Sequence, residues 1–253
     1  MIGKLPKFFA YKAASDLVRI GRNNDGGYLV SKSDIDKTNI LIGLGINDDW
    51  SFEQDFKKIK DVDVLAYDAS ISQRFFIKQL IKSLPKFYKP RSIYRKIRTI
   101  LSYYNFFDKK NNFHIQKFVG LDSDNDHHCS FTSVLDEIVH DDIFLKIDIE
   151  GSEYRFLDNI IANEKRISGM VIEFHDCDIH LNSIQKFIKK TNLKLIHVHA
   201  NNYAPIRATD RLPLVLELSF STYCEQFEVP SLPHQLDMPN GKRLSEIHLV
   251  IDD

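Results

Sequence analysis

Acidic residues end a short apolar run near the middle of the chain. The run at positions 144–147 is followed by Asp148 and Glu150, by the turn residue Gly151, and then by helical spacing. This pattern predicts a buried strand that leads into a helix. Alternate residues of a strand share a face, so the two carboxylates lie on one side, where charges must be solvated, paired or used. The pattern predicts a strand-end carboxylate site, with structural acids near a helix N-terminus as the alternative.

Two later runs also end in groups that can bind ligands or transfer protons. The run at 169–172 precedes Glu173 and His175, and the run at 193–198 leads to His199. In a sheet of parallel strands, ligands bind beyond the carboxyl ends of the strands. A single histidine on such a strand is more often a hydrogen-bonded core residue, whereas acids and histidines at successive strand ends favour a functional site. We therefore expect these polar groups to lie close together.

A glycine-containing turn comes earlier in the chain. An apolar run at 40–42 leads to Gly43 and Gly45, and a helix is predicted to begin near Ser51. Glycines there let a ligand approach the backbone, and the helix N-terminus favours an anionic group. The next predicted strand ends at Asp68, about twenty residues later, where a carboxylate can accept hydrogen bonds from a ribose. The dinucleotide fingerprint needs a third glycine at the position of Asp48, so its absence disfavours a nicotinamide or flavin cofactor.

The segment around 70–107 is basic. It holds nine lysines and arginines and no acid, and aromatic residues lie between them. Apolar residues at helical spacing predict an amphipathic helix that caps the fold. A solvated basic face is one interpretation. The other is a clamp for a phosphate-bearing substrate, with Arg91, Arg95 and Arg98 contacting the phosphates.

Composition bounds the class of protein. The 253 residues, 43% of them hydrophobic, suit a single domain over 1–253 better than two small ones. The formal net charge of -1 provides no overall attraction to nucleic acid or to a membrane. Three scattered cysteines speak against a disulfide framework, and no stretch approaches the ~20 apolar residues of a membrane span. We expect a cytoplasmic protein with no nucleic-acid or integral membrane partner, and the sequence leaves a homo-oligomer open.

The order of the predicted elements defines the fold class. Strands and helices alternate along the chain, and two strands follow one another after position 193. This order predicts an α/β fold with a mostly parallel sheet, helices on both faces and an antiparallel C-terminal strand.

Several of these motifs together resemble the FkbM-type S-adenosylmethionine-dependent O-methyltransferases. The patterns lie at 25–28, 43–53, 145–153, 173–175 and 197–203, and the stretch at 145–153 is the most specific. The basic segment around 70–107 departs from the family pattern. The resemblance implies a class I methyltransferase (Rossmann-like) fold with a seven-stranded sheet and S-adenosylmethionine as the cofactor.

The resemblance also implies roles for single residues. The implied cofactor-binding residues are Gly43, Gly45, Asp48, Phe52, Glu53, Asp68 and Asp148. The implied substrate-binding residues are Asp25, Tyr28, Asn201 and Asn202, beside the three arginines of the basic segment. The implied reaction is methylation of a hydroxyl group of a sugar or a related natural product.

Such a reaction requires that the acceptor oxygen is held in line with the methyl group and loses its proton. The candidates for a catalytic role are Asp148, Glu150, His175 and His199. Asp148, Glu173 and His175 can also supply two oxygens and an imidazole to a divalent cation, and this set suits magnesium, manganese or iron better than structural zinc. Metal-assisted and metal-free chemistry both stay open.

The basic segment directs the prediction of the acceptor. Nine cations among aromatic residues suit a diphosphate and a stacked base, so we expect a nucleotide-linked sugar for surface polysaccharide (capsule or O-antigen) biosynthesis. A non-catalytic glycan- or RNA-binding protein that uses the same segment is the alternative from another class. A nicotinamide-dependent oxidoreductase is the less favoured enzyme alternative.

Overall fold

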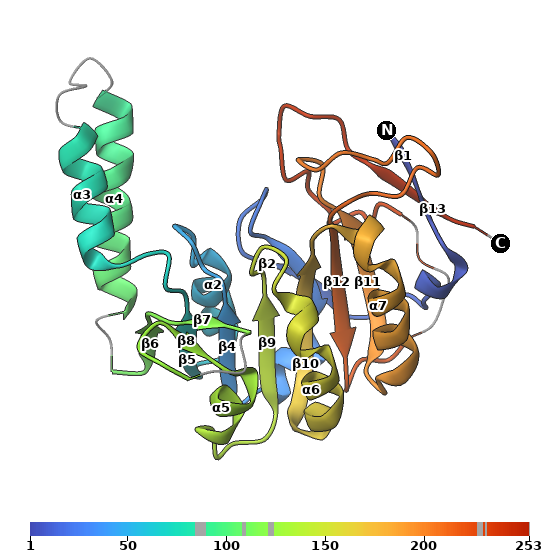
Figure 1. Ribbon diagram of the computed structural model, residues 1–253, viewed down its shortest axis with the longest axis horizontal. Helices are drawn as coiled ribbons and strands as arrows, with labels where there is room; N and C mark the ends of the chain where they lie inside the picture. The colour runs from blue at the N-terminus through green and yellow to red at the C-terminus, as the bar shows by residue number, and fades with distance from the viewer. Residues whose placement is uncertain (84–89, 108–109, 121–123, 227–229, 231, 253) are drawn as a thin grey trace.

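A seven-stranded sheet organises the molecule (Figure 1). This computed structural model describes residues 1–83, 90–107, 110–120, 124–226, 230 and 232–252. The strands, in spatial order, are β11 (Lys194–Ala200), β12 (Leu216–Ser221), β10 (Ile167–Phe174), β9 (Ile143–Ile147), β4 (Ile40–Leu44), β5 (Asp63–Tyr67) and β6 (Asn112–Ile115). Neighbouring strands are parallel except for β12, which is antiparallel to both β10 and β11.

Helices cover both faces of the sheet. One face packs against α1 (Lys32–Lys37) and α2 (Ser51–Ile59), and the other packs against α5 (Phe131–Asp136), α6 (Leu157–Asn163) and α7 (Cys177–Lys190). Short 3-10 helices are η1 (Lys7–Phe9), η3 (Glu153–Phe156) and η4 (Glu164–Arg166). In β9, Ile143, Leu145 and Ile147 join the core under α5 to α7, whereas Phe144 joins the core under α2. This alternation turns Lys146 toward the α2 face.

Three pairs of short strands complete the fold. They are β1 (Ile2–Leu5) with β13 (His248–Ile251), β2 (Leu17–Ile20) with β3 (Tyr28–Ser31), and β7 (Phe118–Val119) with β8 (His128–Cys129). The β2–β3 hairpin lies over β10, β11 and β12 on the face that α1 and α2 share. It therefore takes the place of a covering helix there. The chain leaves the main sheet after Ile115, and β7 belongs to a separate pair.

A helical hairpin stands beside the β5–β6 side of the sheet and extends away from it (Figure 1). It consists of α3 (Gln73–Ser83) and α4 (Pro90–Phe107), which pack against each other. At its base, the ring of Trp50 lies 6.1 Å from that of Phe76 and 5.6 Å from that of Tyr103. The segment is helical as predicted, but it forms two helices where one was expected, and they extend away from the sheet instead of capping it (Figure 1). Two of its nine cations, Lys86 and Lys89, fall in 84–89, outside the described residues.

The strand order places a switch point between β4 and β9. From β4 the chain runs outward through β5 and β6, and it then returns to β9 and continues outward on the other side through β10. Ligands bind at such a point, beyond the carboxyl ends of the strands. The seven strands, their order and the antiparallel β12 make this the class I methyltransferase fold, as predicted. No helix within the described part of the chain is long and apolar enough to cross a membrane.

Candidate functional site

A cavity of about 1030 Å³ lies at the switch point, beyond the carboxyl ends of β4, β5, β9 and β10. The predicted site residues that line it are Asp25, Gly45, Asp48, Phe52, Asp68, Asp148, Glu150, Glu173, His175 and Asn201. Pockets for one small ligand hold roughly 300–1,000 Å³. The cavity is therefore large enough for two ligands side by side, one against the glycine turn and one against the ends of β9 and β10.

The glycine turn is shaped by contacts within the protein. Gly45 has φ +77°, and a Cβ there would lie 1.8 Å from the carbonyl oxygen of Asp148. The loops after β4 and β9 therefore touch directly, and only glycine fits between them. At Gly43 a Cβ would lie 2.6 Å from Oε1 of Glu53. Gly43 and Glu53 do not line the cavity, so the structure corrects their predicted cofactor contacts: Gly43 makes room for the Glu53 side chain below the turn.

Asp68 holds the loop that follows the glycine turn. Its Oδ2 accepts hydrogen bonds from the backbone N–H groups of Ile46 (3.0 Å) and Asn47 (2.8 Å). Its Oδ1 accepts from the N–H (2.7 Å) and the hydroxyl (2.6 Å) of Ser70. A carboxylate offers about four acceptor positions, and these donors use them. Asp68 lines the cavity at the position expected for a ribose contact. That contact stays a prediction, and it requires that one of these four donors leaves the carboxylate.

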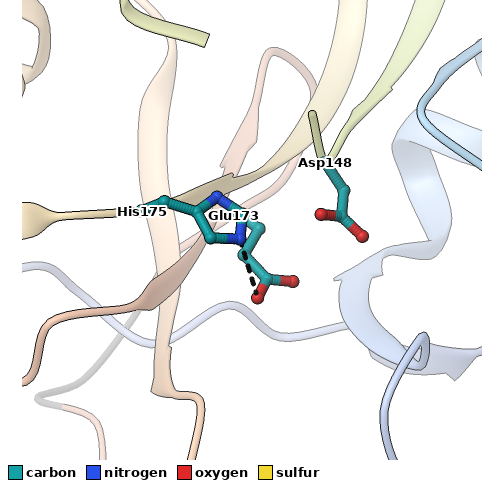
Figure 2. Close-up of side chains that lie close together, drawn as sticks. All are labelled: Asp148, Glu173 and His175. Carbon is teal, nitrogen blue, oxygen red and sulfur yellow. Dashed lines mark ion pairs between the residues drawn. The ribbon is translucent and has the colours of Figure 1, made fainter. Parts of the chain in front are cut away.

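Asp148, Glu173 and His175 converge on one point at the other side of the cavity (Figure 2). One ligand atom from each residue can be chosen so that all three lie within 4.8 Å of one another. This is the predicted set of two carboxylates and one imidazole. Nε2 of His175 faces Oε1 of Glu173 at 3.7 Å. Oxygen ligands with one imidazole suit a divalent cation such as magnesium, manganese or iron.

Glu153 orients the imidazole of His175. Its Oε1 accepts the backbone N–H of His175 at 2.7 Å and lies 3.4 Å from Nδ1 of the ring. Its Oε2 accepts the N–H of Gly151 at 2.9 Å, and the Glu153 side chain is fully buried. A metal-binding histidine usually donates its second ring nitrogen to such a carboxylate. This contact therefore leaves Nε2 directed at Glu173 and Asp148, which fits a metal-binding role.

Tyr28 and Asn201 position the carboxylate of Glu173. The Tyr28 hydroxyl lies 3.0 Å from Oε2 of Glu173 and 3.2 Å from Oδ2 of Asp148, and its single proton can be donated to only one of them at a time. Nδ2 of Asn201 donates to Oε1 of Glu173 at 2.9 Å. Tyr28 is buried and does not line the cavity. The structure thus corrects its predicted substrate contact to a positioning role.

The α2 side of the site concentrates carboxyl groups, two of which are buried. Lys146 donates from Nζ to the carbonyl of Gly45 and lies 3.5 Å from Oδ2 of Asp148. Neither carboxyl oxygen of Glu53 has a hydrogen-bond partner among the described residues, and burial raises the pKa of this carboxyl to about 7 although Lys146 opposes the shift. Burial, together with the charge of Asp148, also raises the pKa of Glu173 well above its usual range.

His175 carries the opposite charge in this cluster. Burial alone would lower the pKa of its imidazole, but the hydrogen bond to Glu153 and the charge of Glu173 raise it to about 9. These neighbours favour the protonated ring, and a protonated imidazole cannot accept a proton, so they weigh against His175 as a metal-free general base.

His199 has the same position at a strand end as His175 but lies away from the cavity. Nδ1 of its ring is 3.0 Å from Glu217 and Nε2 is 3.1 Å from Glu246. Burial would lower its pKa, but the charge of Glu217 and these hydrogen bonds raise it to about 10. The structure therefore places His199 away from the cavity, with its ring enclosed by two carboxylates, and this geometry does not support the predicted catalytic role.

Four further predicted substrate contacts are also corrected. The Asn202 side chain is buried, and its amide forms hydrogen bonds with Gly241 and with neighbouring backbone carbonyls. It therefore holds the 241–245 loop and does not contact a ligand in the cavity. Arg91, Arg95 and Arg98 are exposed on α4, and none of them lines the cavity. The reason is the direction of the hairpin, which extends away from the strand ends (Figure 1).

Other side chains that contribute to the site were not predicted. Lys146 and Glu153 belong to the motif at 145–153. Lys146 shares a strand face with Asp148, so the alternation of side chains along the strand could have identified it as a site residue. Two exposed arginines, Arg22 and Arg155, and the half-buried Lys117 also line the cavity. No sequence pattern marked these three, because they come from separate loops that only the fold brings together.

Comparisons with known proteins give structural similarities alone. No family model matches the chain, and no curated protein matches it, so the FkbM-type resemblance stays a prediction. The precorrin-6y C5,15-methyltransferase of Geobacter metallireducens is similar with a TM-score of 0.41 and 11% identity, over 75% of this chain and 84% of that one. An rRNA methylase of Streptococcus thermophilus is similar with a TM-score of 0.37 and 7% identity, over 73% and 87%. TYW2 of M. jannaschii, in complex with AdoMet, is similar with a TM-score of 0.36 and 11% identity, over 77% and 82%. The fold is assigned here from the order and directions of the strands.

Proposed function

We propose that this protein is an S-adenosylmethionine-dependent O-methyltransferase that acts on a hydroxyl group of a sugar. One observation carries the proposal: a single cavity at the switch point joins the glycine turn to the cluster of Asp148, Glu173 and His175. The first part suits the cofactor, whose methyl group is activated by the sulfonium. The second part suits a divalent cation that holds and acidifies the acceptor hydroxyl.

The reaction breaks the bond between the methyl carbon and sulfur as the bond between that carbon and the acceptor oxygen forms. The hydroxyl proton must pass to a base. Glu150 is our candidate, because it lines the cavity, its side chain is 85% exposed, and its Oε2 lies 3.6 Å from Nε2 of His175. Asp148 and Glu173 would hold the cation, and Glu153 would keep the His175 ring directed toward it.

The charge of the cavity supports this division of roles. Asp148, Glu173 and the buried Glu53 lie around a single lysine, Lys146. An excess of carboxylates favours cations, and both a sulfonium and a divalent metal ion are cationic. Asp68 would contact the ribose of the cofactor.

For the acceptor we propose a nucleotide-linked sugar of the kind used for surface polysaccharides. The arginines of α4 no longer support this choice, since they lie outside the cavity. Arg22, Lys117 and Arg155 line it instead and offer contacts to phosphate groups.

Calorimetric titration of the full chain with S-adenosylhomocysteine and with NAD tests the cofactor. We expect binding of the first and none of the second, and the reverse result would refute the methyltransferase proposal. Transfer of a labelled methyl group to nucleotide-linked and free sugars then tests the acceptor. Equal activity on both kinds of sugar would contradict a phosphate contribution to binding.

Metal analysis tests the cation separately. We expect one divalent cation per chain, loss of transfer after EDTA treatment, and recovery on addition of magnesium, manganese or iron. Glu173→Gln should lose the metal, whereas the exposed control Glu137→Gln should keep it. Full transfer by a chelated protein that contains no metal would remove the cation from the proposal and leave the cofactor assignment untouched.

A further inference from the structure

The hairpin of α3 and α4 exposes a large amount of apolar surface. The exposed side chains are Ile77 (43%), Ile81 (58%), Tyr94 (68%), Ile97 (41%), Leu101 (58%) and Tyr104 (37%). Single exposed apolar residues are ordinary, but a group of this size on one element marks an interaction site. The group lies on the part of the molecule that extends away from the sheet (Figure 1).

These apolar residues follow the helical repeat. On α4 the positions 94, 97, 101 and 104 are spaced by three and four residues, so they form one stripe along the helix. On α3, Ile77 and Ile81 are four residues apart and form a second, shorter stripe. Both stripes face solvent, while Phe76 and Tyr103 use the buried sides of the two helices against Trp50.

A cationic stripe runs beside each apolar stripe. Arg74, Lys78 and Lys82 are four residues apart on α3, and Arg91, Arg95 and Arg98 are spaced by four and three residues on α4. All six of these side chains are exposed. An exposed apolar stripe beside a cationic one is the pattern of helices that lie in the interface of a membrane.

The distribution of charge over the whole chain separates this segment from the rest. Residues 69–107 contain nine of the 34 basic residues and none of the 35 acidic ones. The rest of the chain holds 25 basic and 35 acidic residues, so its net charge is -10 against +9 for the segment. The near-neutral total therefore conceals a strongly polarised molecule, which an anionic surface would orient with the hairpin toward it.

We propose that the α3–α4 hairpin docks this protein on a membrane surface that contains anionic phospholipids. Lipid headgroups neutralise the cationic stripes, and the aliphatic stripes enter the boundary of the acyl region. A second copy is a poorer occupant, because two such hairpins would bring like charges together. RNA is poorer as well: Tyr94 and Tyr104 offer stacking faces, but the four aliphatic side chains offer none and would stay exposed to water.

Docking would also place the cavity close to the membrane. Phe75 of α3 lines the cavity, so the base of the hairpin and the candidate site adjoin. The docking proposal rests on the hairpin alone and does not depend on the proposed methyl transfer.

Flotation of the full chain with lipid vesicles tests the proposal. We compare vesicles of phosphatidylcholine with vesicles that also contain phosphatidylglycerol, at low and at high salt. We expect the protein to float with the anionic vesicles, to stay behind with the neutral ones, and to dissociate as salt screens the charges. No flotation with anionic vesicles, or binding to an RNA homopolymer in place of vesicles, would overturn the proposal.

Matched variants locate the binding surface. Replacing Arg91, Arg95 and Arg98 with glutamine should lower the vesicle partition coefficient by roughly tenfold or more. The control triple Lys165→Gln, Lys189→Gln and Lys190→Gln makes the same charge change at exposed positions elsewhere and should have little effect.

A second pair of variants tests the apolar contribution. Leu101→Asp should weaken vesicle binding, whereas Ile179→Asp, at a 74% exposed position on α7, should not. Circular dichroism verifies that each variant is folded. Equal loss in the hairpin variants and in their controls would mean that the hairpin is not the docking surface, and the proposal would fail.

Discussion

Replacing Glu53 with glutamine should remove a pH-dependent destabilisation of the fold. The Glu53 side chain is buried above Gly43, without a hydrogen-bond partner among the described residues, and burial raises the pKa of its carboxyl from an ordinary value of 4.5 to about 7. A carboxyl with such a pKa binds its proton more tightly in the folded state than in the unfolded state. Glutamine has nearly the same shape and cannot ionise.

The magnitude follows from the two pKa values. Below about pH 4.5 the carboxyl is protonated in both states, so it makes no pH-dependent contribution. As the pH rises from about 4.5 to about 7, the unfolded chain releases the proton and the folded chain keeps it, and stability falls. The difference between 4.5 and about 7 corresponds to a loss of about 3 kcal/mol, complete above about pH 7.

Urea denaturation at about pH 5 and about pH 8 measures this loss. Relative to the unsubstituted protein, Glu53→Gln should gain about 2–3 kcal/mol more at the higher pH than at the lower one. Burial raises the pKa of Asp34 to about 7 as well, but Asp34 acts equally in both proteins and cancels in the comparison. The exposed control Glu137→Gln should show no such difference.

The same pH difference for Glu53→Gln and for the control would refute the reasoning, because it would mean that Glu53 is solvated or paired in solution. Calorimetry adds an independent readout. Glu53 does not line the cavity, so affinity for S-adenosylhomocysteine should not change in the variant. A large loss of affinity would restore the cofactor contact predicted from the sequence.

Three further substitutions separate positioning roles from stability. Tyr28→Phe removes the hydroxyl donor between Asp148 and Glu173, so turnover should fall about tenfold. Affinity for S-adenosylhomocysteine should stay the same. Equal losses of turnover and affinity would argue against a positioning role. Asp68→Ala should weaken S-adenosylhomocysteine binding by about 1–3 kcal/mol in calorimetry, and unchanged affinity would remove the cofactor assignment. His199→Ala leaves the buried Glu217 and the half-buried Glu246 without their cation. It should lower the free energy of unfolding by about 3–5 kcal/mol, measured by denaturation, with the pH dependence of turnover unchanged.

Periodicity and turn residues were enough to predict the main sheet. The apolar runs that became β4, β9 and β10 are bounded by glycine or acidic residues, and their alternation places side chains on defined faces. The prediction that Asp148 and Glu173 lie together also needed no coordinates. Asp148 follows β9, and Glu173 lies near the end of β10. The two strands pair in parallel, with Ile147 opposite Ile172, so the carboxylates emerge at the same edge of the sheet.

Local sequence could not distinguish His175 from His199, since both come at the end of an apolar run that carries polar neighbours. The difference comes from the sheet, in which the antiparallel β12 lies between β10 and β11. His199 therefore faces Glu217 of β12, while His175 follows the strand that borders β9. Strand order depends on contacts between distant parts of the chain, and no pattern within one strand records it.

The basic segment also separates what the sequence determines from what the tertiary structure determines. Its helical repeat and its lack of acids are properties of the sequence, and they determined that it forms amphipathic helices. Whether its arginines meet the cavity depends on the direction in which the hairpin leaves the sheet, and the packing of Phe76 and Tyr103 on Trp50 sets that direction. Propensity and periodicity act over a few residues, so the sequence by itself determined the elements and their faces. The tertiary packing of distant side chains decided which of those faces meet at the site.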